Sequence, residues 1–195
     1  KKDKLRMKFA IITHVIHGKE SGNYFGYEPY VREMNLWIKY TSEVLIVAPL
    51  HQIPKSPIQE FYHHDTIHFT AIPNFDITNL KSAFKAVFVM PKIVWNIYQT
   101  MEKADHIHLR CPGNIGLLGC LVQILFPSKP KTAKYAGNWD PKAKQPLTYR
   151  LQKWILSNTF LTRNRRCWFM VNGKILLKIS SLFLRQAILK RIKSK

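Results

Sequence analysis

Short apolar runs alternate with longer amphipathic stretches along this chain of 195 residues. Five runs predict strands: Met7–His14, Glu43–Ala48, Thr66–Ile72, His106–Arg110 and Lys131–Tyr135. The first is nearly continuously apolar, as in a strand buried on both faces, and the second is also buried, whereas His106–Arg110 alternates between polar and apolar residues. Between them, apolar residues recur at helical spacing and predict four helices: Pro29 to Tyr40, Asn79 to Lys103, Ile115–Phe126 and Pro146–Ser157. Pro91 is expected to kink or split the second of these helices.

The order of these elements predicts an α/β domain with a mainly parallel sheet flanked by helices. Right-handed crossovers place the carboxyl ends of the strands on one edge of the sheet. Ligands of open α/β sheets bind at that edge. Residues 14–26, 110–114 and 137–139 all follow strands and map to it, so the sequence predicts a binding site there.

Two candidate residues lie on one strand of this edge. Arg110 suits an anion or sugar-hydroxyl contact because its guanidinium is a planar fork of five donors, or it forms a structural pair with an acid. His108 is either a ligand contact or a satisfied core histidine. In the turn that follows, Pro112-Gly113-Asn114 favours a helix N-cap at Asn114, and the free N–H groups of the helix could hold a ligand oxygen.

Two loops supply the other candidates. Residues 17–26 carry a glycine every fourth residue, without the GxGxxG spacing of a dinucleotide site, and we interpret them as a flexible loop facing a substrate. After the fifth strand, Asn138 and Trp139 combine an amide with an aromatic ring, as sugar sites do, or they pack under a loop. These loop candidates are Gly18, Gly22, Asn23, Asn138 and Trp139.

The sequence gives no sign of metal, cofactor or nucleophile chemistry. The three cysteines lack metal-ligand spacing and are interpreted as reduced thiols of a cytoplasmic protein. No P-loop, nucleophile elbow or Asp-x-Asp occurs. No signal peptide or membrane span is predicted either.

The charge pattern divides the chain in two. The net charge is +20, all 11 acidic residues precede residue 163, and 10 of the 31 Lys and Arg lie in 163–195. Such a basic chain suggests an anionic partner. We therefore predict a folded domain over residues 1–162 and a basic tail over 163–195 that forms no independent domain.

Three stretches, GKESGNYFGYEPYVREMNLW, HIHLRCPGNIG and AKYAGNW, together resemble the N-terminal half of bacterial GT-B glycosyltransferases of group 1. The resemblance covers roughly residues 7–162. It implies a single Rossmann-like lobe of a GT-B enzyme, which binds the acceptor while a second lobe binds the nucleotide-sugar donor. The transfer implied is retaining, metal-independent and without a resident cofactor, and it serves polysaccharide or glycoconjugate synthesis.

The resemblance also implies acceptor-side roles for the loop 18–26, His108, Arg110, Asn114 and Asn138. The expected partners are a glycan or lipid-linked acceptor, a nucleotide-sugar, and the anionic inner face of the cytoplasmic membrane. No donor lobe follows residue 162, so this chain alone is expected to be inactive. Codons for 170–195 can be chosen so that a neighbouring frame encodes a segment of mixed charge, and we hypothesise a frameshift origin for the tail.

Two other function classes stay open. A non-enzymatic nucleic-acid-binding protein fits the charge, although no sequence-specific nucleic-acid motif is present. A peripheral membrane module fits the segment 175–192, in which Leu, Ile and Phe are interleaved with Lys and Arg.

Overall fold

The computed structural model describes residues 7–73, 80–136, 145–162, 165–171 and 174–177. Its main sheet has the strand order β10-β9-β8-β7-β1-β4-β6. Every neighbouring pair is parallel except β9 with β10. The strands are β1 (Lys8–Ile12), β4 (Glu43–Pro49), β6 (Ile67–Ile72), β7 (His106–Cys111), β8 (Lys131–Tyr135), β9 (Arg165–Val171) and β10 (Lys174–Leu177).

This order is that of a Rossmann sheet. Counted along the chain, the strands from β6 to β9 lie in the order 3-2-1-4-5-6, which defines the doubly wound fold. The predicted α/β fold with a mainly parallel sheet is therefore confirmed. The chain reverses its direction of travel across the sheet between β1 and β7, which are direct neighbours.

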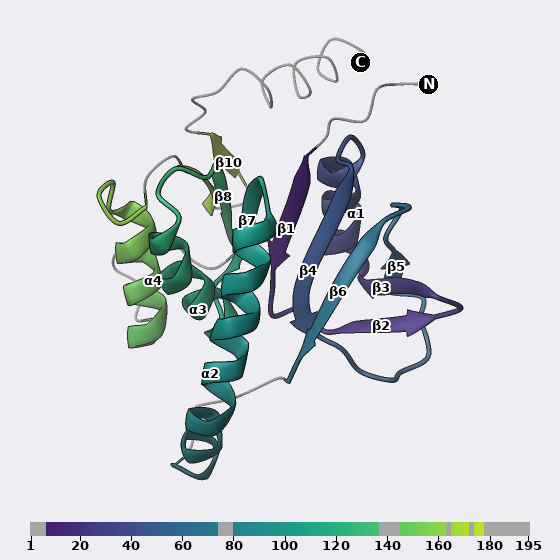
Figure 1. The fold of residues 1–195 in the computed structure, drawn as a ribbon, viewed down its shortest axis with the longest axis horizontal. Helices are drawn as coiled ribbons and strands as arrows, with labels where there is room; N and C mark the ends of the chain where they lie inside the picture. Colours follow the sequence, from purple (N-terminus) through teal and green to yellow (C-terminus); the bar gives the residue numbers. More distant parts are fainter. Residues whose placement is uncertain (1–6, 74–79, 137–144, 163–164, 172–173, 178–195) are drawn as a thin grey trace.

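Helices cover both faces of the sheet (Figure 1). One face carries α1 (Glu28–Ile38), and the other carries α2 (Leu80–Lys103), α3 (Asn114–Val122) with the short 3₁₀ helix η1 (Gln123–Leu125), and α4 (Leu147–Ser157). Pro91 lies inside α2, which continues past it as one helix rather than splitting in two. The predicted cap of α2, Asn79, lies outside the described residues.

Successive side chains of β1 point to opposite faces of the sheet and belong to two hydrophobic cores. Phe9 and Ile11 pack toward α1 with Val31 and Met34. Ile12 packs on the opposite face, in the core formed with α2 and α3. Each of these side chains is at most 2% exposed, and burying such a side chain contributes about 1.5–3 kcal/mol. Both faces of β1 are thus apolar, as its nearly continuous hydrophobic pattern predicts.

Residues 17–26 are not a loop, so this prediction was wrong. They form the hairpin β2 (His17–Glu20) and β3 (Asn23–Tyr27), which β5 (Gln59–Phe61) extends to a small antiparallel sheet. Ser21 and Gly22 turn the chain with φ of 48° and 85°, as a two-residue hairpin requires. The hairpin is anchored after β4, where the His51 N–H donates to the His17 carbonyl over 2.9 Å.

The sheet extends past residue 162, because β9 and β10 are its last two strands. In β9, Arg165 pairs with Lys131 of β8 and Phe169 with Tyr135. The division into a domain over 1–162 and a tail over 163–195 stays a prediction, although β9 and β10 lie within the predicted tail. Most of the proposed amphipathic segment 175–192 lies outside the described residues.

Candidate functional site

The strand order places one candidate site at the carboxyl ends of β1 and β7. Open α/β sheets bind ligands in the crevice where the strand order reverses. His14 follows β1 and Gly113 follows β7, and the two residues are in contact: a Cβ on Gly113 would lie 2.8 Å from His14 Nδ1. Gly113 also has a φ of 155°. Glycine therefore allows the two strand ends to approach each other this closely.

Arg110, near the end of β7, is the main electropositive group of this edge. Its Nε and Nη1 atoms are buried without a hydrogen-bond partner, and its guanidinium carbon lies 5.4 Å from the centroid of the Tyr30 ring. Within the described residues it forms no ion pair with an acid, in contrast to the structural pairing that the sequence left open. Buried donors of this kind can recognise a ligand oxygen without first breaking a protein contact.

The neighbouring cation is already paired. Lys134 of β8 is in register with Arg110, and its ammonium group contacts the Glu33 carboxylate of α1. Because Lys134 neutralises the Glu33 carboxylate, the negative charge of Glu33 does not cancel the positive charge of the Arg110 guanidinium. The two cations thus differ in role: one connects the sheet to α1, and the other is free to bind an anion or a hydroxyl.

The N-terminus of α3 adds donors to the same edge. Gly113 is the N-cap and Asn114 the first helical residue, so the prediction of Asn114 as the cap was wrong by one position. No side chain caps this helix, and the first N–H groups of any helix lack partners within it. The helix dipole places partial positive charge here as well, which favours a negatively charged ligand.

His14 lies between these groups. Burial first, and then the charge of Arg110, lowers the pKa of its imidazole, so the ring is neutral at pH 7. A neutral ring has one donor and one acceptor nitrogen. It can therefore donate to or accept from a ligand hydroxyl without adding charge to the site.

Aromatic and hydroxyl groups support this edge from the α1 side. His17 donates from Nδ1 to the Val15 carbonyl over 2.7 Å and accepts at Nε2 from the Tyr62 hydroxyl over 2.8 Å. Burial raises the pKa of Tyr30 to about 12, although Thr13, Tyr62 and Arg110 each act to lower it. Burial also lowers the pKa of His17 to about 4. This part of the edge is therefore uncharged and fixed in place.

His108 lies in the core rather than at the edge. It is 1% exposed, stacks near Phe9 at 6.0 Å between ring centroids, and has Nδ1 2.9 Å from Thr132 Oγ1. Burial and the nearby charges of His106, Arg110 and Lys134 lower its pKa to about 3. Its position supports the core alternative, and a role in acceptor binding stays a prediction.

The hairpin candidates have local structural reasons to be where they are. A Cβ on Gly18 would lie 2.2–2.8 Å from ring carbons of Phe25, and Gly22 supplies the positive φ of the turn. Asn23 is exposed at the start of β3. Their predicted roles in acceptor binding remain untested, and Asn138 and Trp139 lie outside the described residues.

Three residues of the edge were missed from the sequence: Tyr30, Glu33 and Lys134. A signal existed for Lys134, since it alternates with apolar residues on the strand beside Arg110. Tyr30 and Glu33 gave no comparable signal, because they resemble ordinary residues of an amphipathic helix. Among the described residues, no three His, Cys, Asp or Glu side chains gather as metal ligands would.

Comparisons with known proteins give only distant structural similarities. No protein-family model and no curated protein matches this sequence. A solved structure described as a UDP-N-acetylglucosamine 2-epimerase from Listeria monocytogenes is similar with a TM-score of 0.42 and 12% identity, over 77% of this chain and 38% of that one. A second UDP-N-acetylglucosamine 2-epimerase structure has a TM-score of 0.38 and 8% identity, over 77% and 40%. The chain thus spans about two fifths of the length of either, and its α/β assignment rests on its own strand order.

Proposed function

We propose that this domain is the acceptor-binding lobe of a glycosyltransferase that transfers a sugar from a nucleotide-sugar to a glycan or lipid-linked acceptor. The observation that carries the proposal is Arg110, whose Nε and Nη1 atoms are buried and unpartnered beside the N-terminus of α3. It lies where the strand order of the sheet reverses. The resemblance of residues 7–162 to group 1 GT-B enzymes supplies the reaction class.

The groups at this edge suit an acceptor with hydroxyl and anionic groups. The Arg110 fork can form two parallel hydrogen bonds to a carboxylate, a phosphate or a pair of hydroxyls. His14 can exchange hydrogen bonds with a further hydroxyl, and the N–H groups at the start of α3 can donate to a ligand oxygen. In this proposal the chain binds and orients the acceptor, and the donor is held by a second wall of the cleft, since transfer needs both reactants together.

Titration of the purified chain with inorganic phosphate, a uronic-acid disaccharide and a neutral disaccharide, followed by calorimetry, tests the proposal. Arg110→Gln should weaken binding of the two anions about tenfold or more, because a charge-assisted hydrogen bond contributes about 1.5–3 kcal/mol. Arg150→Gln, which removes an exposed arginine of α4, should leave it unchanged. Equal affinities for both variants, or no binding of any of the three, would contradict an acceptor site at Arg110.

A second function is favoured by one observation, the net charge of +20. A protein that binds nucleic acid through its phosphates should do so with an affinity that falls steeply with salt. Arg110→Gln should not alter this binding more than Arg150→Gln does, because counterion release depends on the number of charges neutralised. Duplex binding that persists at high salt would favour a nucleic-acid-binding protein over a glycosyltransferase lobe.

A further inference from the structure

Helix α2 has apolar residues on two sides. One side faces the core with Ala86, Ile93, Ile97 and Met101, all at most 2% exposed. The other side carries, at helical spacing, the exposed side chains Phe84 (68%), Val87 (61%), Phe88 (70%) and Trp95 (58%). A surface helix needs only one apolar stripe to fold, so the outer stripe has no role in the described core.

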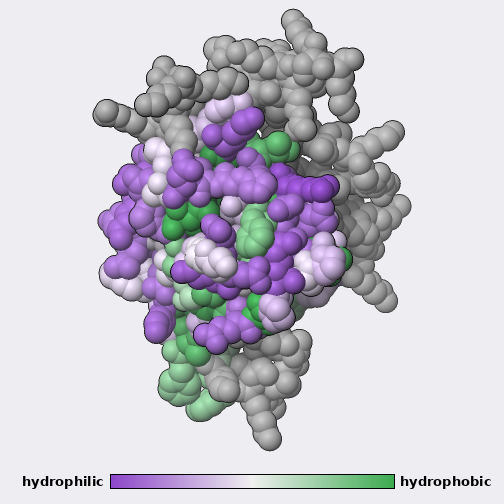
Figure 2. Space-filling model, turned by 90° about the vertical axis from the view of Figure 1, so that its right-hand side faces the viewer, coloured by the Kyte–Doolittle hydropathy of each residue, from purple (hydrophilic) through white to green (hydrophobic). Residues whose placement is uncertain are grey.

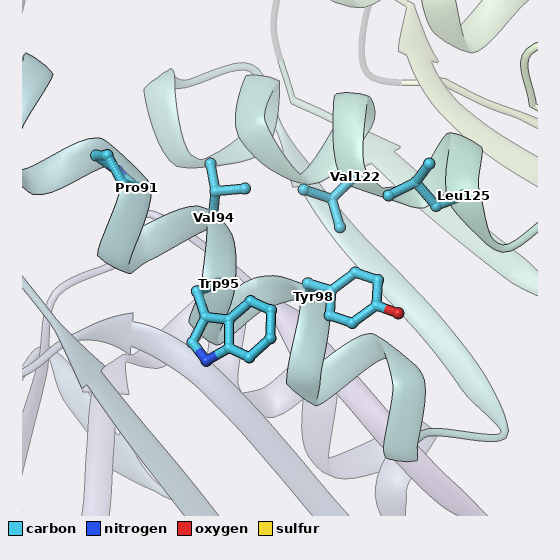
Figure 3. Close-up of a pocket in the computed structure, with 6 residues that line it drawn as sticks. All are labelled: Pro91, Val94, Trp95, Tyr98, Val122 and Leu125. Carbon is cyan, nitrogen blue, oxygen red and sulfur yellow. The ribbon is translucent and has the colours of Figure 1, made fainter.

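Two adjoining hollows lie along this outer stripe. The first, of about 320 Å³, is lined by Pro91, Val94, Trp95, Tyr98, Val122 and Leu125. The second, of about 310 Å³, shares Pro91 and Val94 with it. Figure 3 shows Val94 of α2 and Val122 of α3 facing each other across the first hollow, with Trp95 and Tyr98 side by side. The lining is thus almost entirely apolar.

The other helices on this side of the sheet, α3, η1 and α4 (Figure 1), also expose apolar side chains. Leu121 of α3, Leu125 of η1, and Leu147 and Trp154 of α4 are 44%, 65%, 77% and 57% exposed. Residues 115–126, predicted as one helix, form most of α3 and the 3₁₀ helix η1, and Leu121 and Leu125 lie on their outer side. We call the exposed apolar residues of α2, α3, η1 and α4 the helix-layer surface. The adjacent side of the molecule is mainly hydrophilic (Figure 2).

Nearly all charged residues in the helices of the helix-layer surface are basic. No Asp or Glu occurs in α3, η1 or α4, and the first acid of α2 is Glu102, its penultimate residue. The basic residues of the same helices before that point are Lys81, Lys85, Lys92, Arg150 and Lys153. Of these, Lys92 and Arg150 are exposed, so these helices combine exposed Trp, Phe and Leu with exposed cations and contain no acid before Glu102.

We infer that the helix-layer surface docks onto an anionic phospholipid membrane. Aromatic side chains are favoured at the depth of the headgroups, and each basic residue near an anionic bilayer contributes about 1 kcal/mol. The two apolar hollows can receive parts of acyl chains. Within the residues that the structure describes, no helix is long and apolar enough to cross a bilayer, so the domain lies on the membrane. The inference uses no residue of the carboxyl-edge site.

Flotation of the full chain with vesicles tests this inference. Binding is expected to vesicles with one third phosphatidylglycerol and to be at least about tenfold weaker to pure phosphatidylcholine. The double variant Phe88→Gln/Trp95→Gln keeps the net charge at +20 and should weaken binding to anionic vesicles about tenfold or more. Leu36→Gln on α1, where the side chain is 53% exposed, is the matched control and should bind like the natural chain.

Because the double variant has the same net charge as the natural chain, its binding distinguishes docking through the helix-layer surface from a general attraction of a basic protein to anionic vesicles. If the double variant binds anionic vesicles as the natural chain does, the helix-layer surface is not the docking site and the inference fails. The inference also fails if the natural chain floats with neither kind of vesicle and instead sediments as a dimer that the two substitutions abolish. The surface would then be an interface between two copies of the chain. Circular dichroism and the unfolding midpoint of each variant establish that it is folded, which is expected because the substituted side chains are exposed.

Discussion

The guanidinium of Arg110 lies over the ring of Tyr30, with 5.4 Å between the guanidinium carbon and the ring centroid. Two elements far apart in the sequence, β7 and α1, thereby meet at the point where the strand order reverses. A cation–π contact stabilises the guanidinium but satisfies none of its N–H donors. Arg110 is therefore held in position without being saturated, as a ligand-binding group should be.

Replacing Arg110 by methionine should stabilise the fold. Its buried Nε and Nη1 atoms have no partner, and methionine removes that cost while filling similar space. We expect the free energy of unfolding in urea to rise by about 1 kcal/mol. Arg150→Met on the surface of α4 should change it by less than about 0.5 kcal/mol. A clear loss of stability in Arg110→Met would mean that the guanidinium has a partner in the folded protein.

Acid should destabilise the protein through His17. Burial lowers its pKa from 6.5 to about 4, so the unfolded state binds a proton in this range and the folded state does not. Stability is therefore intact above pH 6.5, falls with pH toward 4, and the His17 contribution to this loss is about 3 kcal/mol. Urea titrations at pH 7, 5.5 and 4.5 measure it. His17→Gln should flatten the pH dependence, and an unchanged slope would assign the loss to other groups.

The hydroxyl of Thr132 should stabilise the fold, because it forms hydrogen bonds with two histidines. Its Oγ1 lies 2.9 Å from His108 Nδ1 and 3.0 Å from His106 Nε2. Thr132→Val leaves a buried histidine nitrogen without this partner and should cost about 1–3 kcal/mol of unfolding free energy. Thr132→Ser retains the hydroxyl and should recover most of the loss. Equal stability of the two variants would show that the contact does not contribute.

The hairpin should tolerate one glycine substitution and not another. Gly18→Ala places a methyl group within 2.2–2.8 Å of the Phe25 ring, which is fully buried, and should cost about 1–3 kcal/mol. Gly22→Asn has open space around it, and asparagine accepts the positive φ of this turn, so its cost should be below about 1 kcal/mol. Thermal unfolding of both variants tests the order, and a reversed order would contradict the register of β2 with β3.

The strands of the central sheet could be predicted because their apolar runs are nearly continuous, as in Ile11 and Ile46 and their neighbours. The carboxyl edge followed from the alternation of strands and helices. Strands β2, β3, β5, β9 and β10 were not predicted, and β3 and β9 illustrate two different reasons. The hairpin strand at Asn23 is polar at its start, although Ser21-Gly22 was a usable turn signal. Strand β9 was obscured by the abrupt rise in basic residues after position 162.

The site itself was only half predictable. Arg110 and Gly113 could be placed by their position after an apolar strand. The register of Arg110 with Lys134, and the pairing of Lys134 with Glu33, are tertiary choices among several cations and acids. From the sequence alone, an Arg110 paired with an acid was an equal alternative. No local feature determines whether Arg110 or Lys134 forms the ion pair with Glu33.

Strand β7 also protects the fold against a shifted pairing. His106, His108 and Arg110 share one face of the strand, and Ile107, Leu109 and Cys111 share the other. A slip of one residue against β1 would exchange these faces, placing a guanidinium among the apolar side chains under α2 and α3. Such a misfolded sheet would bury an unpaired charge in a hydrophobic core. The same alternation that places Arg110 on the α1 side of β7 thus penalises the nearest wrong alignment of the central strands during folding.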